Sequence, residues 1–167
     1  MSNTPSQPLD HQSLKQVFLH NLNRVYFGKC YLNSKLGNLI QFASFKALQY
    51  AIQEFWDDIK KQITRMEEIY KLIHETPSDK NCNPIKSIVR DEFCLDEDQL
   101  HVLKDMDLIM YLQLLEHINI TSCRMLIMVA RQLNYTDELQ LLTECFDESI
   151  DNDELFMLLS KEYLTED

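Results

Sequence analysis

Two short stretches carry residue types that could bind metal. Residues 54–60 read EFWDDIK, and residues 114–119 read LLEHIN. In four-helix bundles with a two-metal centre, carboxylates and Glu-x-x-His pairs from facing helices supply the ligands. The corresponding i, i+3 pair here is Asp57 and Lys60. A charged lysine has no lone pair, so it takes the place of a cation and does not bind one.

The chain contains further acidic residues but no Glu-x-x-His motif. Glu116 has Leu114, Leu115 and Ile118 around it, which favours an inward orientation. His117 lies ~100° around the helix from Glu116, so the two do not readily serve one ion. For the other acids, a solvated surface position is the simpler interpretation. These acids are Asp58, Asp147, Glu148, Asp151 and Asp153.

Composition limits the fold class. The chain has 167 residues, enough for one domain with a core of its own. It contains only two glycines and four prolines, whereas sheets joined by hairpins use such turn residues repeatedly. We therefore expect an all-α protein.

Apolar residues recur at spacings of three and four, which predicts long amphipathic helices. Gly37 is the expected end of the first helix, and Ser44 and Thr136 are expected caps. The third long helix is apolar around much of its circumference and is expected to be the most buried. The predicted helices are 14–37, 44–75, 104–133 and 136–164, with a short helix over 85–93. They predict a four-helix bundle of two antiparallel hairpins, joined by a crossover that contains the short helix. The predicted bundle forms a single domain over residues 13–167, and residues 1–12 form a flexible tail.

Charge is distributed unevenly along the chain. Residues 1–90 have a formal charge of +4 and residues 91–167 of −15, which together give the net charge of −11. The two halves are therefore electrostatically complementary. A nucleic-acid partner is not expected, because phosphate binding needs a basic surface. An acidic C-terminal hairpin that binds a basic protein partner remains an alternative function.

Cysteines and hydropathy point to the cytoplasm. The five cysteines are odd in number and widely spaced, so they suggest neither a disulfide framework nor a zinc ribbon. The longest fully apolar run, 125–130, is far shorter than the ~20 residues that span a bilayer. We expect a cytoplasmic protein without membrane association.

The chain resembles the YciE/YciF-like ferritin-like family, a bacterial group of stress-associated four-helix bundles of the di-iron type. The resemblance is carried by LKQVFLHNLNRVYFGKCYL, by QITRMEEIYKL with the proline and cysteine of the crossover, by DLIMYLQLLEHINITSCRMLIMVARQLN and by ECFDESIDNDEL. It implies a ferritin-like bundle, an iron or manganese centre and a homodimer.

The family's ligand positions are altered in this chain. The glutamate of the first helix is Lys29, and the Glu-x-x-His of the second helix falls on Asp57 and Lys60. Glu116 is kept in the third helix, but Asn119 replaces the second acidic residue of the family's motif there. In the fourth helix, Ser149 occupies a ligand position beside Glu148. We therefore expect no catalytic residues, no cofactor and no enzyme activity. Asp57, Glu116 and Glu148 would be the vestige of the metal site.

Two lysines at former ligand positions suggest what replaces the metal. In this hypothesis Lys29 and Lys60 pair with Asp57 and Glu116, so that ammonium charge neutralises the acidic centre. The alternative for both lysines is that they extend to the surface. A residual iron- or manganese-binding protein or oxidase, using Asp57, Glu116 and acids of the last helix, is the alternative function.

Overall fold

The computed structural model describes residues 9–80 and 82–165, and within them it contains helices and no strand. The helices are α1 (His11–Phe42), α2 (Lys46–Leu72), α3 (Pro84–Val89), η1 (Glu92–Cys94), α4 (His101–Leu133) and α5 (Thr136–Leu164). The predicted all-α fold with four long helices is confirmed. No helix in the described ranges combines the length and the hydropathy of a membrane-spanning segment.

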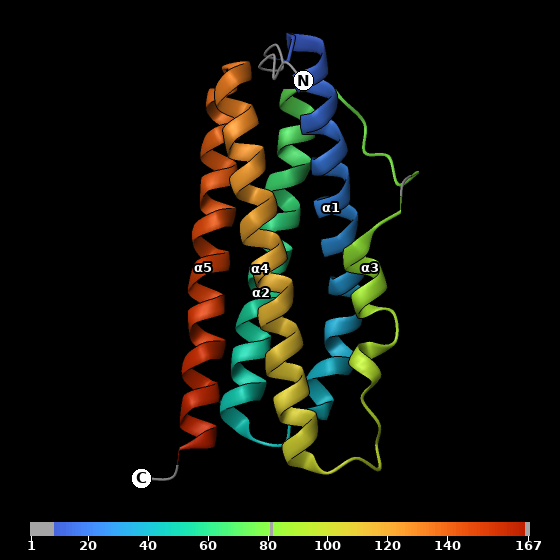
Figure 1. Ribbon diagram of the computed structural model, residues 1–167, viewed down its shortest axis with the longest axis vertical. Coiled ribbons are helices and arrows are strands. Elements are labelled where there is room, and N and C mark those ends of the chain that lie inside the picture. The colour runs from blue at the N-terminus through green and yellow to red at the C-terminus, as the bar shows by residue number, and fades with distance from the viewer. Residues whose placement is uncertain (1–8, 81, 166–167) are drawn as a thin grey trace, which may run out of the picture.

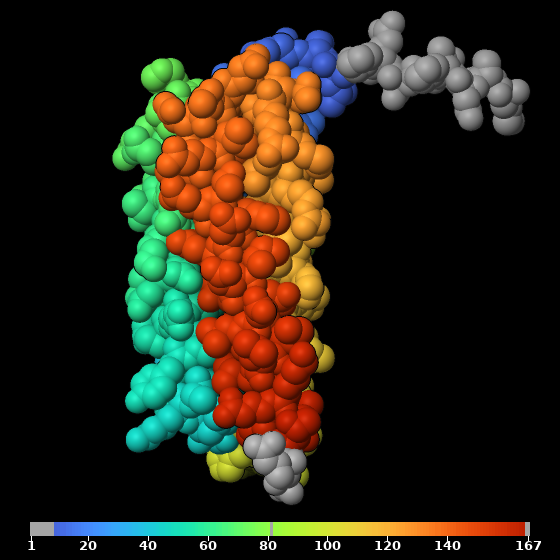
Figure 2. Space-filling model, turned by 90° about the vertical axis from the view of Figure 1, so that its left-hand side faces the viewer, coloured from blue at the N-terminus to red at the C-terminus, as the bar shows by residue number. Residues whose placement is uncertain are grey.

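The four long helices form a bundle of two hairpins (Figure 1). Helix α1 packs against α2 and α4, and α5 packs against the same two helices. The crossover after α2 runs back along the outside of the bundle, where α3 packs against α1 (Figure 1). In Figure 2, α5 extends along the length of the molecule between α2 and α4. The two hairpins are thus antiparallel, as predicted.

The N-terminal half corrects two predicted helix boundaries. Asp10 caps α1 by accepting a hydrogen bond from the backbone N–H of Ser13 at 2.7 Å, and most of the predicted tail, 1–12, lies outside the described residues. Gly37 does not end α1. A Cβ at this position would lie 3.2 Å from the Trp56 ring, so the glycine allows close packing of α1 on α2. Ser44 does not cap α2, because its N–H and hydroxyl both donate to the carboxylate of Asp105.

The C-terminal half also differs in detail. The predicted short helix is two pieces, α3 and η1, and α4 begins at His101, three residues earlier than predicted. Asn134 ends α4 in the left-handed conformation, with φ of 57°. Thr136 is the first residue of α5 and not its cap. Helix α4 has more buried residues than α1, α2 or α5, as predicted, although its outer face exposes Met110, Met125 and Met128.

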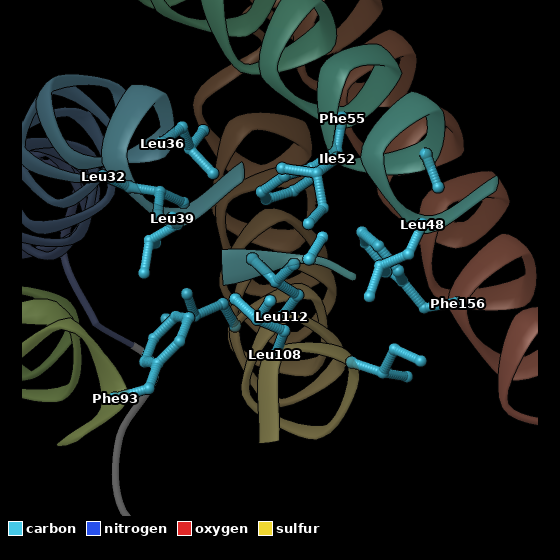
Figure 3. Close-up of a cluster of buried hydrophobic side chains, with 14 of the residues drawn as sticks. Leu32, Leu36, Leu39, Leu48, Ile52, Phe55, Phe93, Leu108, Leu112 and Phe156 are labelled. Atoms are coloured by element: carbon cyan, nitrogen blue, oxygen red, sulfur yellow. The ribbon is translucent and has the colours of Figure 1, made fainter. Parts of the chain in front are cut away.

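The core consists of two hydrophobic clusters, one in each half of the bundle. The cluster near the α1–α2 turn, shown in Figure 3, includes Leu32, Leu36, Ile52, Phe55, Leu108, Leu112 and Phe156. The cluster at the other end includes Phe18, Leu22, Met66, Ile69, Leu126 and Leu142. These two sets are separated by about two turns on α1 and α2, about three on α4 and about four on α5. The side chains in that interval decide what lies in the middle of the protein.

Gly28 allows α3 to lie directly on α1. A Cβ built on Gly28 would lie 2.6 Å from Cδ1 and 2.8 Å from Cβ of Ile85, both closer than such carbon atoms approach in practice. We predict that Gly28→Ala destabilises the protein by ~1–3 kcal/mol, because overpacking outweighs the gain of up to ~1 kcal/mol in helix propensity. Urea unfolding followed by circular dichroism measures the change.

Gly37→Ala is the matched control, because Gly37 is also inside α1 but faces a ring edge at 3.2 Å. This variant should be much less destabilised than Gly28→Ala. Equal stability of the two variants would contradict the role assigned to Gly28.

Candidate functional site

A layer of buried polar side chains lies between the two hydrophobic clusters. Each long helix contributes to it at the position between its two sets of apolar residues. On α2, for example, Gln62 lies between Ile59 and Met66. We call this set the polar layer; its members are at most 3% exposed, and they are Lys29, Gln62, Glu116, Asn119, Ser149 and Asn152.

Lys29 places an ammonium group inside the bundle. The residue is 1% exposed, and its Nζ donates to Oε1 of Gln62 at 2.6 Å. The Nε2 of Gln62 in turn donates to Oε2 of Glu148 at 3.1 Å, and Nη1 of Arg65 donates to the same oxygen at 2.8 Å. A chain of hydrogen bonds therefore connects the buried ammonium with a half-buried carboxylate on α5.

Glu116 supplies the buried carboxyl group of the polar layer. Nδ2 of Asn119 donates to its Oε1 at 3.3 Å. Among the described residues, Oε2 of Glu116 and the hydroxyl of Ser149 beside it have no hydrogen-bond partner. Complete burial raises the pKa of Glu116 to about 7, although the charge of Lys29 and the neighbouring Ser149 and Asn119 act in the opposite direction. Glu116 thus titrates near neutral pH.

Two thiols lie within the electrostatic reach of Lys29 but stay protonated. Burial raises the pKa of Cys123 to about 12 and that of Cys145 to about 11, although Lys29 lowers both. Metal coordination by cysteine requires the thiolate. These two residues therefore act as small buried groups at neutral pH.

Asp57 and Lys60 lie outside the polar layer. Their side chains are 54% and 48% exposed, and Nζ of Lys60 is 3.0 Å from Oδ1 of Asp57. Lys60 also lies over the Trp56 ring, 4.3 Å from its centroid. The two residues therefore pair with each other on the surface, which is the alternative position for Lys60, and not in an interior centre with Glu116. The structure separates them from Lys29 and Glu116.

The polar residues of α2 that join the interior network are Gln62, which is buried, and Arg65, which is partly buried; they have the same i, i+3 spacing. Sequence reasoning missed them. The available signal was the apolar stripe of α2: Gln62 continues the series of Phe55, Ile59 and Met66 at steps of three and four. A polar residue inside an otherwise apolar stripe marks an interior polar group.

The remaining predicted acids have several different settings. Oδ2 of Asp58 accepts from Nδ2 of Asn152 at 3.2 Å. Oδ1 of Asp153 lies 3.4 Å from Nε2 of His117. Glu148 joins the hydrogen-bond chain from Lys29, as described above, while Asp147 and Asp151 are exposed. The acids of α5 are thus divided between the interior network and the outer surface.

The polar layer does not fit a two-metal centre. Such a centre needs several inward carboxylates and neutral imidazoles. The layer presents one fully buried carboxyl group, an ammonium group and neutral amides and hydroxyls. In residues 9–80 and 82–165, no group of three or more His, Cys, Asp and Glu side chains is arranged to hold an ion.

Comparison with known proteins places the fold. Residues 13–167 match the family described as a domain of unknown function, DUF892. The E. coli stress protein YciF superposes with a TM-score of 0.84 at 22% identity, covering 92% of this chain and 98% of that one. YcfI from Rhodopseudomonas palustris gives 0.80 at 21% identity, covering 94% and 98%. No curated protein matches the chain. The predicted YciF-like fold is confirmed.

The raised pKa of Glu116 makes stability depend on pH. Between its ordinary value of 4.5 and about 7, the folded protein keeps a proton that the unfolded chain releases, so rising pH favours unfolding. The rise in pKa corresponds to roughly 3 kcal/mol, present below pH 4.5 and lost above pH 7. We predict that wild type loses stability relative to Glu116→Gln over this interval. Urea unfolding at a series of pH values measures it, and a constant difference would contradict the assignment.

Lys29 and Glu116 should be energetically coupled. At pH 8, Glu116→Gln leaves the buried ammonium without this carboxylate but also removes the cost of burying the carboxylate charge. Glu116→Gln and Lys29→Met should therefore each cost less than the ~3–5 kcal/mol of a broken tight ion pair. The double variant should be more stable than additivity predicts, by ~1–3 kcal/mol. Unfolding of the four proteins at pH 8 gives the coupling energy.

The exposed pair provides the control for this cycle. Asp57→Asn and Lys60→Met, singly or together, should leave the free energy of unfolding almost unchanged. A larger coupling at this surface pair than at Lys29 and Glu116 would overturn the interpretation.

Proposed function

We propose that this chain, which belongs to the DUF892 family, is a non-catalytic ferritin-like bundle protein in which lysine–carboxylate pairing replaces a di-metal site. The observation that carries the proposal is the ammonium of Lys29, which is 1% exposed in the middle of the bundle. A cation supplied by the chain itself occupies the region where a metal centre would need its ligands.

Electrostatics supports this substitution. A buried carboxylate requires a positive partner or a proton. Lys29 lowers the pKa of Glu116, while burial raises it, so the ammonium performs part of the neutralisation that a metal would perform. Glu116 and Glu148 are the vestigial ligands nearest to this centre. Asp57, the third residue of the proposed vestige, is paired with Lys60 at the surface.

The cellular role proposed here follows the family. E. coli YciF is a stress protein, and a structural role has been ascribed to YcfI. We propose a stress-associated role without catalysis for this chain, in the cytoplasm of a bacterium and as a homodimer. Sedimentation of the purified protein tests the last point.

Metal titration tests the proposed loss of the site. Anaerobic addition of Fe(II) or Mn(II) to the purified protein should give no stoichiometric binding, and later exposure to oxygen should give no rapid oxidation of Fe(II). Tight binding abolished by Glu116→Gln and Glu148→Gln, but retained in Asp57→Asn, would instead support a residual metal-binding protein.

A gain-of-function variant makes this test sharper. Lys29→Glu with Gln62→Glu replaces a cation and an amide by two carboxylates that face Glu116 across the polar layer. This variant should bind Mn(II) more tightly than wild type. The same substitution at Lys60, which is exposed, should leave metal affinity unchanged.

A further inference from the structure

A pocket of about 430 Å³ lies at the end of the bundle where α1 ends and α4 begins. It is distinct from the polar layer, because the hydrophobic cluster of Figure 3 lies between them. Its lining includes Asn38, Gln41, Glu92, Glu97 and Lys104. The volume is at the lower end of the range for small-molecule sites, roughly 300–1,000 Å³.

Lys104 is a buried cation without a matching anion. The residue is 6% exposed, and its Nζ donates to the backbone carbonyl of Glu97 at 3.2 Å. Within the described ranges it forms no ion pair. The neighbouring carboxylate of Asp105 accepts instead from Ser44 and from the hydroxyl of Tyr163 at 3.0 Å. Since a buried charge is costly unless it is paired, this wall favours an anionic ligand group.

Two helix ends of opposite polarity meet at the same pocket. Helix α1 ends at Phe42 with no basic residue in its last turn. Helix α4 begins at His101 with no acidic residue in its first turn and no side-chain cap from Leu100. Uncompensated helix ends carry about half a unit charge, negative at the C-terminus and positive at the N-terminus. The pocket therefore offers a positive and a negative side to one small ligand.

The other acidic residue of the lining, Glu92, already has a partner. Its Oε1 is 3.2 Å from Nζ of Lys35. Glu92, Phe93 and Cys94 all have positive φ, at 47°, 59° and 56°, a costly conformation for residues with side chains. Stacking of the buried Phe93 ring on Tyr111, at a centroid distance of 5.1 Å, holds this turn in place. Glu97 is thus the lining carboxylate that lacks a lysine partner within the described residues.

We propose that this pocket binds a small zwitterion of amino-acid size. Its carboxylate lies toward Lys104 and the N-terminus of α4, and its ammonium lies toward Glu97 and the C-terminal carbonyls of α1. The lining has one lysine and one histidine, His101, beside two carboxylates, which suits a monoanionic group better than a phosphate dianion. The amide side chains of Asn38 and Gln41 supply further polar contacts with the remainder of the ligand.

Calorimetric titration of the full chain with each proteinogenic amino acid tests the proposal. At least one amino acid should bind, and more tightly than acetate, methylammonium or inorganic phosphate, each of which has only part of the required charge. Lys104→Met should weaken binding about tenfold or more, because it removes a charge-assisted hydrogen bond. The control is Lys46→Met, since Lys46 is exposed and does not line the pocket; it should leave binding unchanged.

A second measurement does not depend on finding the right amino acid. Without ligand, Lys104→Met should unfold at a higher temperature than wild type, because an unpaired buried charge is replaced by an apolar chain of similar length. Lower stability of this variant, absence of binding by any amino acid, or binding of phosphate alone would overturn the proposal.

Discussion

The ammonium of Lys29 is buried between two hydrophobic clusters, and its need for partners accounts for the other polar side chains in the middle of the bundle. A charge in such a position costs several kcal/mol unless hydrogen bonds and an opposite charge compensate it. Gln62 supplies the hydrogen bond and Glu116 the acid, so α2 and α4 must present these residues at the level where α1 presents Lys29. The polar layer therefore sets the relative register of the long helices.

The basic N-terminal half and the acidic C-terminal half of the chain form few direct ion pairs with each other among the described residues. Among the described residues, Arg65 is paired with Glu144 and Glu148, and Lys35 with Glu92, across the division at residue 90. Arg65 is the important one, because it extends the network of Lys29 to the surface of α5. The overall complementarity predicted from charge thus matters here mainly where it is connected with a buried group.

A shared fold with YciF does not determine the chemistry inside it. At 21–22% identity, the superpositions show the architecture alone. Function depends on the side chains that a fold presents, and a few substitutions in one interior layer can change an ion-binding bundle into an inert one. The end pocket and the polar layer can have independent functions, because the hydrophobic cluster of Figure 3 lies between them.

Spacing along the chain was sufficient to predict the four long helices and the inward position of Glu116, because a 3.6-residue period places each apolar residue on a definite face. The apolar stripe of α2 also contained Gln62, but its contacts with Lys29 and Glu148 were decided only by packing. Every face of a helix contains i, i+3 pairs, so spacing alone does not show which pair faces the core. Asp57 and Lys60 have the spacing of a metal-binding motif but are exposed, whereas Gln62 is buried. The end pocket likewise depends on tertiary structure, since it combines the ends of α1 and α4 with the crossover. A short sequence motif determines the spacing of its residues along a helix, whereas packing of the helices around a common core determines which of them face the interior.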